Sequence, residues 1–480
     1  MLGKNKEEGK VIKDVYPDTT SAEYSKYINK WIKIETIMGG EDYIKEAGKR
    51  YLPILSGQND LDYREYIERG TFYNATKRTS IGLTGTIMRK EPQIECPPLV
   101  NRILDKVGSE KQSIQEIVRL VVQNIIDYGY YGILVDAPAI TEEEIFAGKP
   151  SGQPYMALYS PGTILNHRIT FIDGKNKLSM VSLAEKETFV DPDNFFNTLS
   201  KDVVRVLQLD KNGILFIQLF EKTEGKEGAS WRQVGKDIYP QVMGKKWTEI
   251  PFVFFGSVSN TPFPDEPLLM DLANLNLAHW RVTVDYYHGL HYCGMPTPWA
   301  AGFGSDAQLR LGGKTAWVSD DPNARCGYLE LTGKSIETIK VALNDLEKQM
   351  AVIGGRWLEQ QKKAAEAAET VSMHYSGDTA TLSTVVTSAE QGLRKAINYL
   401  SRWLGQEENA EVKLNRDFVS GKMSAQDITA LLQALQAGKI SIDTFLYNLQ
   451  RGEILPEMRT IEDEKLLIAS SGNDEFENRE

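Results

Sequence analysis

Two stretches of helically spaced apolar residues frame the middle of the chain. The first follows Pro264-Asp265-Glu266-Pro267 and continues to about Gly289, and Asp265 is expected to cap its free N–H groups. The second follows Ser335, and Gly354-Gly355 is expected to end or bend it. Its apolar residues stand three and four apart, which is typical of a seam that packs against neighbouring helices: Ile336, Ile339, Leu343, Leu346, Met350 and Ile353. The pattern predicts a helical hairpin, either inside one globular fold or protruding and in need of partners.

Prolines and glycines between the two helices exclude a long helix there. Thr315–Val318 and Tyr328–Leu331 have the composition of strands, which predicts a small β-rich excursion at the tip of the hairpin. This excursion carries three large aromatic side chains, Trp299, Trp317 and Tyr328. They are too many for a free loop, so we predict that they pack between neighbouring copies of the chain.

The part of the chain before the hairpin changes from a helical pattern to a strand pattern. Residues 1–20 are charged and have no apolar period, which is typical of a flexible arm. Helical spacing predicts helices over 21–45, 60–76 and 78–88, then a strongly apolar helix capped by Ser113 and a strand over 131–135. The candidate strands that follow are 177–187, 203–209, 214–221 and 251–255. This order predicts the α+β class.

The part of the chain after the hairpin is mostly helical. Residues 356–378 are rich in Lys, Glu, Gln and Ala, and a weak stretch at Ser376-Gly377-Asp378 precedes a long amphipathic helix that Gly405 closes. A strand over 411–414 and two short helices, 424–437 and 441–450, follow. The last residues, 470–480, are polar and acidic and are predicted to be disordered.

Composition narrows the class of protein. The 480 residues are 41% hydrophobic and 25% charged, which describes a soluble globular protein of several domains. The net charge of −11 argues against a general nucleic-acid binder, although DNA could pass such a surface without sticking. Three scattered cysteines, Cys96, Cys293 and Cys326, favour neither a disulfide framework nor a zinc site and fit a reducing cytoplasm. We expect no signal peptide and no membrane span.

Motifs for cofactor chemistry are incomplete. Gly313-Lys314-Thr315 ends like a nucleotide-binding loop, but Gln308 stands where that loop requires glycine. Gly302-Phe303-Gly304 mimics a dinucleotide fingerprint without a strand and helix around it. His288 and His291 could form a metal pair, but the sequence offers no candidate for a third ligand beyond Cys293. The alternative is a helix end where imidazoles meet carbonyls. We therefore expect no catalytic residue, no cofactor and no metal.

The order of these parts resembles the portal protein of tailed bacteriophages. More narrowly, it resembles a podovirus-like portal family long described as a domain of unknown function. The similarity spans most of residues 20–460. The residues that carry it are Tyr51-Leu52-Pro53, Leu55-Ser56-Gly57, Tyr73-Asn74-Ala75-Thr76, Arg78-Thr79, Gly82-Leu83, Asp127-Tyr128-Gly129-Tyr130-Tyr131-Gly132, Ile250-Pro251 and Pro267-Leu268-Leu269 with Asp271-Leu272.

The resemblance implies a ring, usually of twelve subunits, at one vertex of a capsid. It implies an arm (1–20), an α/β wing (21–263 and 379–415), two stem helices (264–291 and 335–355), a clip (292–334), a tunnel segment (356–378), a helical crown (416–469) and a disordered tail (470–480). Double-stranded DNA would pass through the ring, driven by a separate packaging ATPase, the large subunit of terminase. Other implied partners are the major capsid protein, a head–tail adaptor and, as a further candidate, a scaffolding protein. The protein would be made in the host bacterial cytoplasm and end in the virion.

Candidate site residues follow from this resemblance. Basic side chains after the glycine pair would face the channel and touch phosphates without reading sequence: Arg356, Lys362, Lys363 and His374. The second stem helix would offer a subunit interface, formed by Ile336, Ile339, Leu343, Leu346 and Met350. A solvated outer helix is the alternative for the basic segment. Two other classes of function stay open, a soluble enzyme with an unrecognised site and another ring component of the virion, such as a head-completion adaptor.

Overall fold

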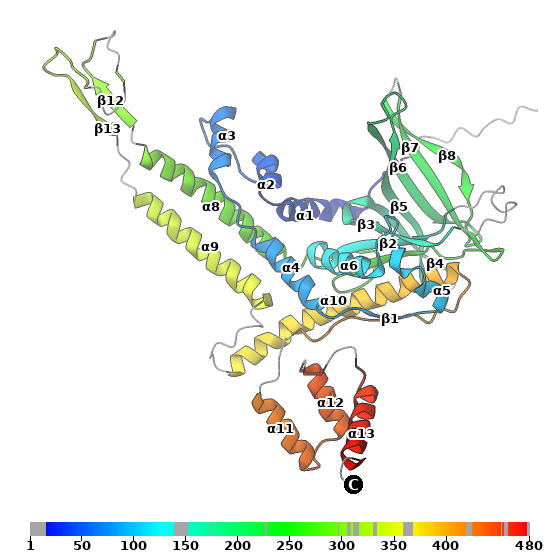
Figure 1. Cartoon of the computed structure of the whole chain (residues 1–480). Helices are drawn as coiled ribbons and strands as arrows, with labels where there is room; N and C mark the ends of the chain where they lie inside the picture. Colours follow the sequence, from blue (N-terminus) through cyan, green and yellow to red (C-terminus); the bar gives the residue numbers. More distant parts are fainter. Residues whose placement is uncertain are drawn as a thin grey trace, which may run out of the picture. The chain divides into compact units, whose positions relative to one another are not determined.

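The computed structural model describes residues 16–138, 152–172, 174–225, 228–295, 297–304, 309–310, 316–329, 334–358, 368–418, 425–452, 454–455 and 459–477 (Figure 1). The chain divides into two compact units. The first contains residues 1–359 and 365–416, and the second contains residues 360–364 and 417–480. The first unit mixes helices with antiparallel sheets, which confirms the predicted α+β class.

Four short helices open the first unit: α1 (Ala22–Gly39), α2 (Glu41–Ala47), α3 (Asp60–Arg69) and α4 (Ala75–Ile87). The predicted single helices over 21–45 and 60–76 are each interrupted, the first at Gly40 and the second at Gly70. A side-chain cap is present at the second restart, from Asn74, whereas Gly40 gives α2 none. Asn59 forms a capping box with Asp62 at the start of α3, and the Asn74 side chain accepts from the Lys77 N–H at the start of α4.

A buried helix and sheet form the centre of this unit. The side chain of Ser113 accepts from the Glu116 N–H in a capping box, as predicted, and α6 (Ile114–Tyr128) then ends at Gly129, whose φ of +65° suits glycine. The chain continues into β2 (Tyr130–Asp136), every residue of which is buried. β2 lies between β3 (Tyr155–Tyr159) and β11 (Phe252–Gly256) in an antiparallel sheet, and α6 and α10 contact it.

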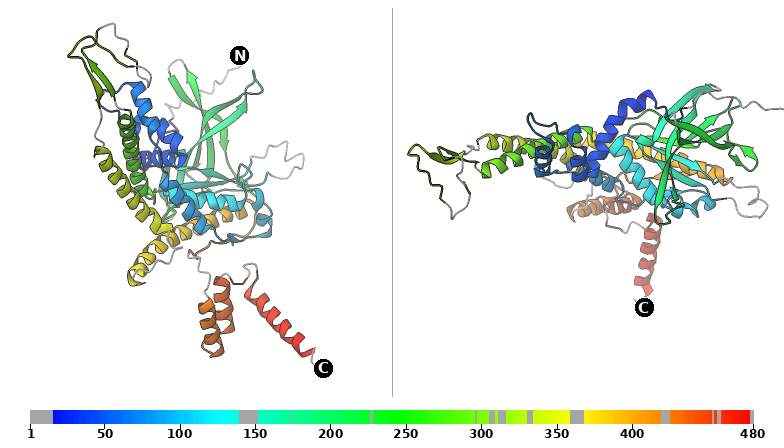
Figure 2. Two further views of the ribbon diagram at one scale, coloured as in Figure 1. Left: turned by 60° about the vertical axis from the view of Figure 1, so that its left-hand side comes forward. Right: turned by 90° about the horizontal axis from the view of Figure 1, so that it is seen from above.

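A larger antiparallel sheet is built from consecutive long strands (Figure 2). They are β4 (Ile164–Ile172), β5 (Lys175–Val190), β6 (Thr198–Leu209), β7 (Leu215–Gly225) and β8 (Gly228–Ile238). The predicted strands over 177–187, 203–209 and 214–221 are confirmed and are longer than predicted. Alternate residues of β4–β7 form the core on one face of this sheet: Leu165, Met180, Val204, Val206 and Phe220. Small pieces complete the unit: β1 (Gln93–Glu95) paired with β14 (Glu411–Lys413), β9 (Gln241–Val242) paired with β10 (Lys245–Lys246), and α5 (Pro98–Asn101).

The predicted helical hairpin is present but its boundaries differ from those predicted. Its helices are α8 (Met270–Gly294) and α9 (Lys334–Leu358), which lie side by side. Asp265 does not cap α8; its carboxylate accepts from the N–H groups of Val258 (2.7 Å) and Ser259 (3.2 Å) and so closes the loop after β11. Ser335 lies inside α9, and Gly354-Gly355 does not end that helix.

The long helix after the hairpin also starts earlier than predicted. α10 (Ala368–Trp403) includes Ser376-Gly377-Asp378, so the predicted weak stretch is wrong. One glycine costs a helix about 1 kcal/mol, which a long, packed helix tolerates. The same reason applies to the glycines near the end of α9. α10 packs against α6, β2, β11 and β14, and Gly405 follows it, as predicted.

The second unit is helical. It contains α11 (Ala425–Gln436), α12 (Ile442–Arg451) and α13 (Ile461–Glu477). The first two confirm the predicted helices over 424–437 and 441–450, and the side chain of Ser441 accepts from the Thr444 N–H to cap α12. α13 continues to Glu477, so the prediction of disorder from residue 470 is corrected over this range. Lys465 of α13 forms an ion pair with Asp443 of α12.

A buried carboxyl in α6 leads to a prediction about pH. Asp127 is 4% exposed and accepts a hydrogen bond of 2.5 Å from the Ser80 hydroxyl. Burial raises its pKa from about 3.8 to about 6, against the opposing effect of the hydrogen bonds from Ser80 and Gln123. The folded state therefore binds more protons than the unfolded state between these values, and stability falls as pH rises through this window.

The variant Asp127→Asn removes the charge that burial disfavours. At pH 7.5 we expect the variant to unfold at a higher temperature than the wild type, with a free energy of unfolding that is larger by about 1–2 kcal/mol. At pH 4 this difference should disappear. Thermal unfolding followed by circular dichroism at both pH values measures the difference. Asp42→Asn, at an exposed position in the first turn of α2, is the control. An equal gain for Asp127→Asn at both pH values would contradict the prediction.

Candidate functional site

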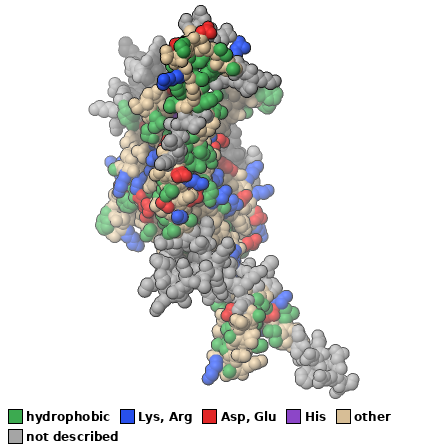
Figure 3. All heavy atoms as spheres, turned by 90° about the vertical axis from the view of Figure 1, so that its left-hand side faces the viewer, with side chains coloured by type: hydrophobic (Ala, Val, Ile, Leu, Met, Phe, Trp, Pro, Cys, Tyr) green, Lys and Arg blue, Asp and Glu red, His purple; other side chains and the backbone are tan. Residues whose placement is uncertain are grey.

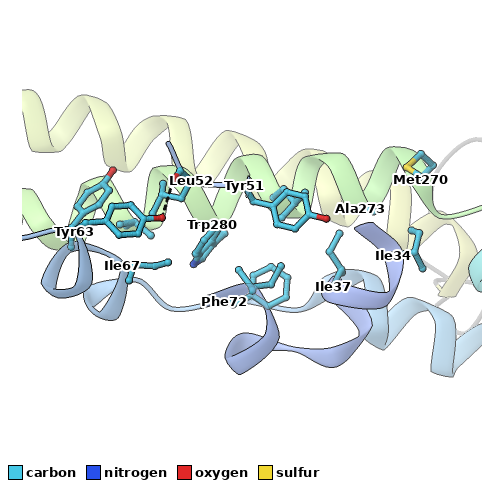
Figure 4. Close-up of a cluster of buried hydrophobic side chains, with 14 residues drawn as sticks. Ile34, Ile37, Tyr51, Leu52, Tyr63, Ile67, Phe72, Met270, Ala273 and Trp280 are labelled. Atoms are coloured by element: carbon cyan, nitrogen blue, oxygen red, sulfur yellow. Dashed lines mark hydrogen bonds between the residues drawn. The ribbon is translucent and has the colours of Figure 1, made fainter. Parts of the chain in front are cut away.

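The α8–α9 hairpin is the element that carries most of the predicted site residues, and one face of α8 anchors it. Residues of this face are buried among side chains of α1, α2 and α3, and Trp280 lies within the cluster (Figure 4). Trp280 and Ala273 are fully buried, whereas Tyr287, Leu290 and Tyr292 in the last turns of α8 are exposed. The first half of α8 is thus core, and its far end presents apolar side chains on the surface of the single chain.

A buried amide sets the position of α8 along α4. The Asn276 side-chain oxygen accepts from the Thr76 N–H (3.1 Å) and from the Thr76 hydroxyl (3.0 Å). Its amide nitrogen donates to the Tyr73 carbonyl oxygen at 2.7 Å. Asn276 is fully buried, so loss of this side chain would leave buried polar groups of α4 unsatisfied. The amide therefore fixes the direction in which the hairpin extends.

Two further polar contacts connect α8 with its neighbours. The Tyr66 hydroxyl of α3 donates to the Asp285 carboxylate, and burial, followed by this hydrogen bond, raises the pKa of Tyr66 well above its usual value. Nε2 of His279 lies 3.5 Å from Oε1 of Glu347 on α9. The first contact joins α8 to α3 and the second joins α8 to α9. Together they connect both helices of the hairpin to the helices at the start of the chain.

The predicted subunit-interface seam has a partner inside the chain. Leu343 and Met350 are 9% and 2% exposed, because α9 packs against α8 and α4. Ile336, Ile339 and Leu346 are half-buried, and Ile336 Cγ1 lies 3.7 Å from where a Cβ would stand on Gly289 of α8. The expectation that this seam faces a second copy is therefore corrected for its two buried residues. Contact of the half-buried three with another subunit stays a prediction.

The β excursion at the end of the hairpin differs from the prediction in its strands. β12 (Thr297–Ala301) pairs with β13 (Arg325–Leu329), with Trp299 opposite Gly327 and Pro298 opposite Tyr328. The expected strand at Thr315–Val318 is absent over its described residues 316–318. The sequence pattern missed β12 because proline argues against a strand, yet a two-stranded sheet has only edge strands, where proline is tolerated.

The predicted aromatic residues of the excursion lie in two settings. Trp317 is off the sheet, where its indole N–H donates to the Arg310 carbonyl (2.8 Å) and its ring meets Phe303 edge-on. Trp299 and Tyr328 are on the sheet and are 45% and 59% exposed. Figure 3 views the molecule from the side of this hairpin and shows hydrophobic side chains at its surface. The predicted contact of the three aromatic side chains with neighbouring copies stays a prediction.

Each face of the β12–β13 sheet carries exposed apolar side chains, and one of them also carries Thr297 and the exposed Arg325. Strand alternation and the pairing register place Trp299 and Leu329 on one face, which we call face A. The same register places Tyr328 and Cys326 on the opposite face, which we call face B. All four side chains are exposed in the single chain. A two-stranded sheet is marginally stable by itself in water, so contacts on its exposed apolar side chains would stabilise it.

The basic residues predicted for a DNA channel fall outside the described side chains. Lys362 and Lys363 are outside the described residues. Arg356 lies in α9 and His374 lies in α10, but only their backbone is described. The prediction that these four residues face DNA therefore stays a prediction.

The structure describes the surroundings of His288, one of the two histidines considered for a metal site. His288 packs edge-on against Tyr66 and Tyr292, with its Nδ1 3.4 Å from Nη1 of Arg69. Burial, then the Arg69 charge, lowers the pKa of His288. In the part of the chain that is described, no group of three His, Cys, Asp or Glu side chains is arranged to hold a metal ion. Gly313-Lys314-Thr315 lies outside the described residues.

Among the helices that the structure describes, none has the length and apolarity needed to cross a membrane.

Sequence reasoning missed a second exposed aromatic pair. Phe195 and Phe196 lie in the turn between β5 and β6 and are 80% and 95% exposed. Side chains fix this turn: Asp191 accepts from the Asp193 N–H and the Asn197 amide, and Asn194 accepts from the Phe196 N–H. The signal in the sequence was two adjacent phenylalanines next to Pro192 and Asp193, where a turn is expected.

Comparison with known proteins gives one family match, to the central part of the chain. A family model described as a domain of unknown function (DUF4055) matches residues 267–404, which contain α8, the β excursion, α9 and α10. No curated protein matches the sequence.

Two of the solved structures that resemble the chain come from gene transfer agent particles. One is described as the neck of an empty gene transfer agent (GTA) particle, with 12% identity, a TM-score of 0.38, and coverage of 84% of this chain and 96% of the other. Another is described as the virion of a native GTA particle, with 13% identity, a TM-score of 0.36, and coverage of 84% and 95%. At such identities and TM-scores neither likeness carries a functional argument.

Proposed function

We propose that this chain is a structural protein of a phage-like virion, the portal that forms a closed ring at one capsid vertex. The observation that carries the proposal is the β12–β13 sheet, which exposes apolar side chains on both faces and stands at the end of a firmly anchored helical hairpin. A surface of this kind needs a partner on each side. In a closed ring every subunit has two neighbours, one on each side, so face A of one copy can cover face B of the next.

The geometry of such contacts favours a ring over a dimer. Faces A and B carry different residues, so the contact between them is heterologous, and a heterologous contact either closes into a ring or continues as a filament. The anchoring of α8 through Trp280 and Asn276 gives each copy the same hairpin direction, which favours closure. The resemblance of the sequence to portal proteins supports this assignment and supplies the expected subunit number of about twelve.

The channel of this ring would conduct double-stranded DNA. We propose that it does so without an active site or cofactor of its own, and that a terminase supplies the energy. The acidic balance of the chain, with a net charge of −11, supports this role, because dense Lys and Arg contacts would hold DNA and slow its passage. The outer surfaces would bind the major capsid protein, the terminase and a head–tail adaptor, which places the protein at the virion's portal vertex.

One experiment tests ring formation directly. The purified full-length chain, at micromolar concentration, is measured by multi-angle light scattering and by negative-stain electron microscopy. We expect a mass of roughly twelve subunits and closed rings with a central hole. A chain that stays monomeric over the whole concentration range, with no rings on the grid, would overturn the proposal.

The basic segment leads to a separate prediction about DNA. We propose that Lys362 and Lys363 form a belt of positive charge in the channel and contact phosphates transiently. The double change Lys362→Glu and Lys363→Glu should leave ring assembly intact and reduce the amount of packaged or retained DNA. Electron microscopy measures the rings, and quantitative PCR of nuclease-treated particles measures the DNA. Full-genome particles at wild-type titre would refute this role.

A further inference from the structure

A basic hollow of 410 Å³ lies in the first unit, where α1, the turn before Tyr51 and the middle of α8 meet. It is separate from the β excursion and from the predicted channel segment. Three of its residues are cationic, and none is acidic. The lining consists of Asn29, Lys33, Arg50, Tyr51, Asn274, Leu277 and Arg281.

Hydrogen bonds among the lining residues orient both amides. Nη2 of Arg50 donates to Oδ1 of Asn29 at 3.0 Å, and Nζ of Lys33 donates to Oδ1 of Asn274 at 3.0 Å. Arginine and lysine have no acceptor, so each amide must turn its oxygen to the cation. The NH₂ groups of both asparagines are left as donors. The two amides therefore offer hydrogen-bond donors to the hollow, in addition to its three positive charges.

Tyr51 is the aromatic residue of the lining. It is 5% exposed, and its buried hydroxyl has no hydrogen-bond partner within the described part of the chain. The Arg50 guanidinium lies over its ring, 5.7 Å from the centroid, and its carbonyl accepts from Nε of Arg281 at 2.5 Å. Figure 4 shows the Tyr51 ring lying along α8. The Tyr51 carbonyl thereby holds the Arg281 guanidinium in the lining of the hollow.

We propose that this hollow binds a phosphate-class oxyanion, either free phosphate or the phosphate group of a nucleic-acid backbone. The hollow offers three cations and two amide NH₂ groups, and its lining contains no carboxylate. A tetrahedral oxyanion presents acceptor oxygens in several directions, and an arginine fork matches two of them. A carboxylate has only two oxygens in one plane and would leave several of these donors unused. The proposal does not depend on ring formation.

Isothermal titration of the full-length chain with inorganic phosphate tests binding, at constant ionic strength set by chloride. We expect saturable binding of phosphate and at least tenfold weaker binding of acetate, because charge-assisted hydrogen bonds would be lost. A second arm titrates a short DNA duplex. Binding of the duplex that phosphate competes away identifies backbone phosphate as the source, and absence of duplex binding identifies free phosphate. No binding of phosphate, or equal binding of acetate, overturns the proposal.

Three variants connect binding to the hollow. Lys33→Gln and Arg50→Gln should each weaken phosphate binding about tenfold. Lys26→Gln is the matched control, because it removes the same charge from an exposed position of α1 outside the hollow. Unchanged phosphate affinity in both Lys33→Gln and Arg50→Gln would refute the assignment.

Discussion

Replacing Trp280 by alanine is expected to lower the free energy of unfolding by about 3–5 kcal/mol, the cost of emptying a large aromatic site in a packed core. Trp280 is fully buried in the cluster that joins α8 to α1, α2 and α3. Its indole N–H has no hydrogen-bond partner among the described residues, so packing accounts for its contribution. Denaturant unfolding of the full-length chain, followed by circular dichroism, measures the loss.

Two further variants control this result. Trp299→Ala makes the same substitution at a side chain that is 45% exposed in the single chain, and at protein concentrations where the chain is monomeric it should change stability by about 0.5 kcal/mol or less. Trp280→Phe keeps an aromatic ring and removes the unpartnered N–H, so it should cost less than half as much as Trp280→Ala. Hydrogen exchange in α1–α3 should accelerate in Trp280→Ala, because these helices lose their shared core. Equal stability losses for Trp280→Ala and Trp299→Ala would contradict the assigned anchor.

Changing either face of the β12–β13 sheet is expected to abolish the ring. Leu329→Ser removes an apolar side chain from face A, and Tyr328→Ser removes one from face B. Each would lose roughly 1.5–3 kcal/mol of apolar burial at every contact, repeated around the ring. Because both side chains are exposed in the single chain, the fold itself should be unaffected. Light scattering of each variant should show small species, and its circular dichroism spectrum should match that of the wild type.

Mixing the two variants tests the proposed head-to-tail contact. The Leu329→Ser copy keeps an intact face B, and the Tyr328→Ser copy keeps an intact face A. One productive contact can therefore form between them, so the mixture should yield heterodimers and no closed rings. Leu61→Ser with Ile81→Ser, an exposed apolar pair on α3 and α4, is the matched control and should leave rings intact. Wild-type rings from both single variants would show that the sheet is not the contact.

Local signals predicted the elements whose cause is local. Ser113 with Glu116 starts α6, Gly129 ends it, and the alternation before and after residue 210 produces β6 and β7. In each case the cap, the turn residue or the apolar period lies within a few positions of the element it shapes. The seam of α9 was recognisable for the same reason, since residues three and four apart share one face of a helix wherever that helix lies.

Tertiary structure decided what those elements contact. The seam of Leu343 and Met350 packs on α8 of its own chain, because an apolar face specifies burial but not the partner that provides it. Pro298 joins a strand only because β13 lies beside it and leaves proline at an edge. The basic hollow had no signal in the sequence at all. Lys33, Arg50 and Arg281 come from three distant segments, and only the packing of α8 against α1 brings their charges to one place.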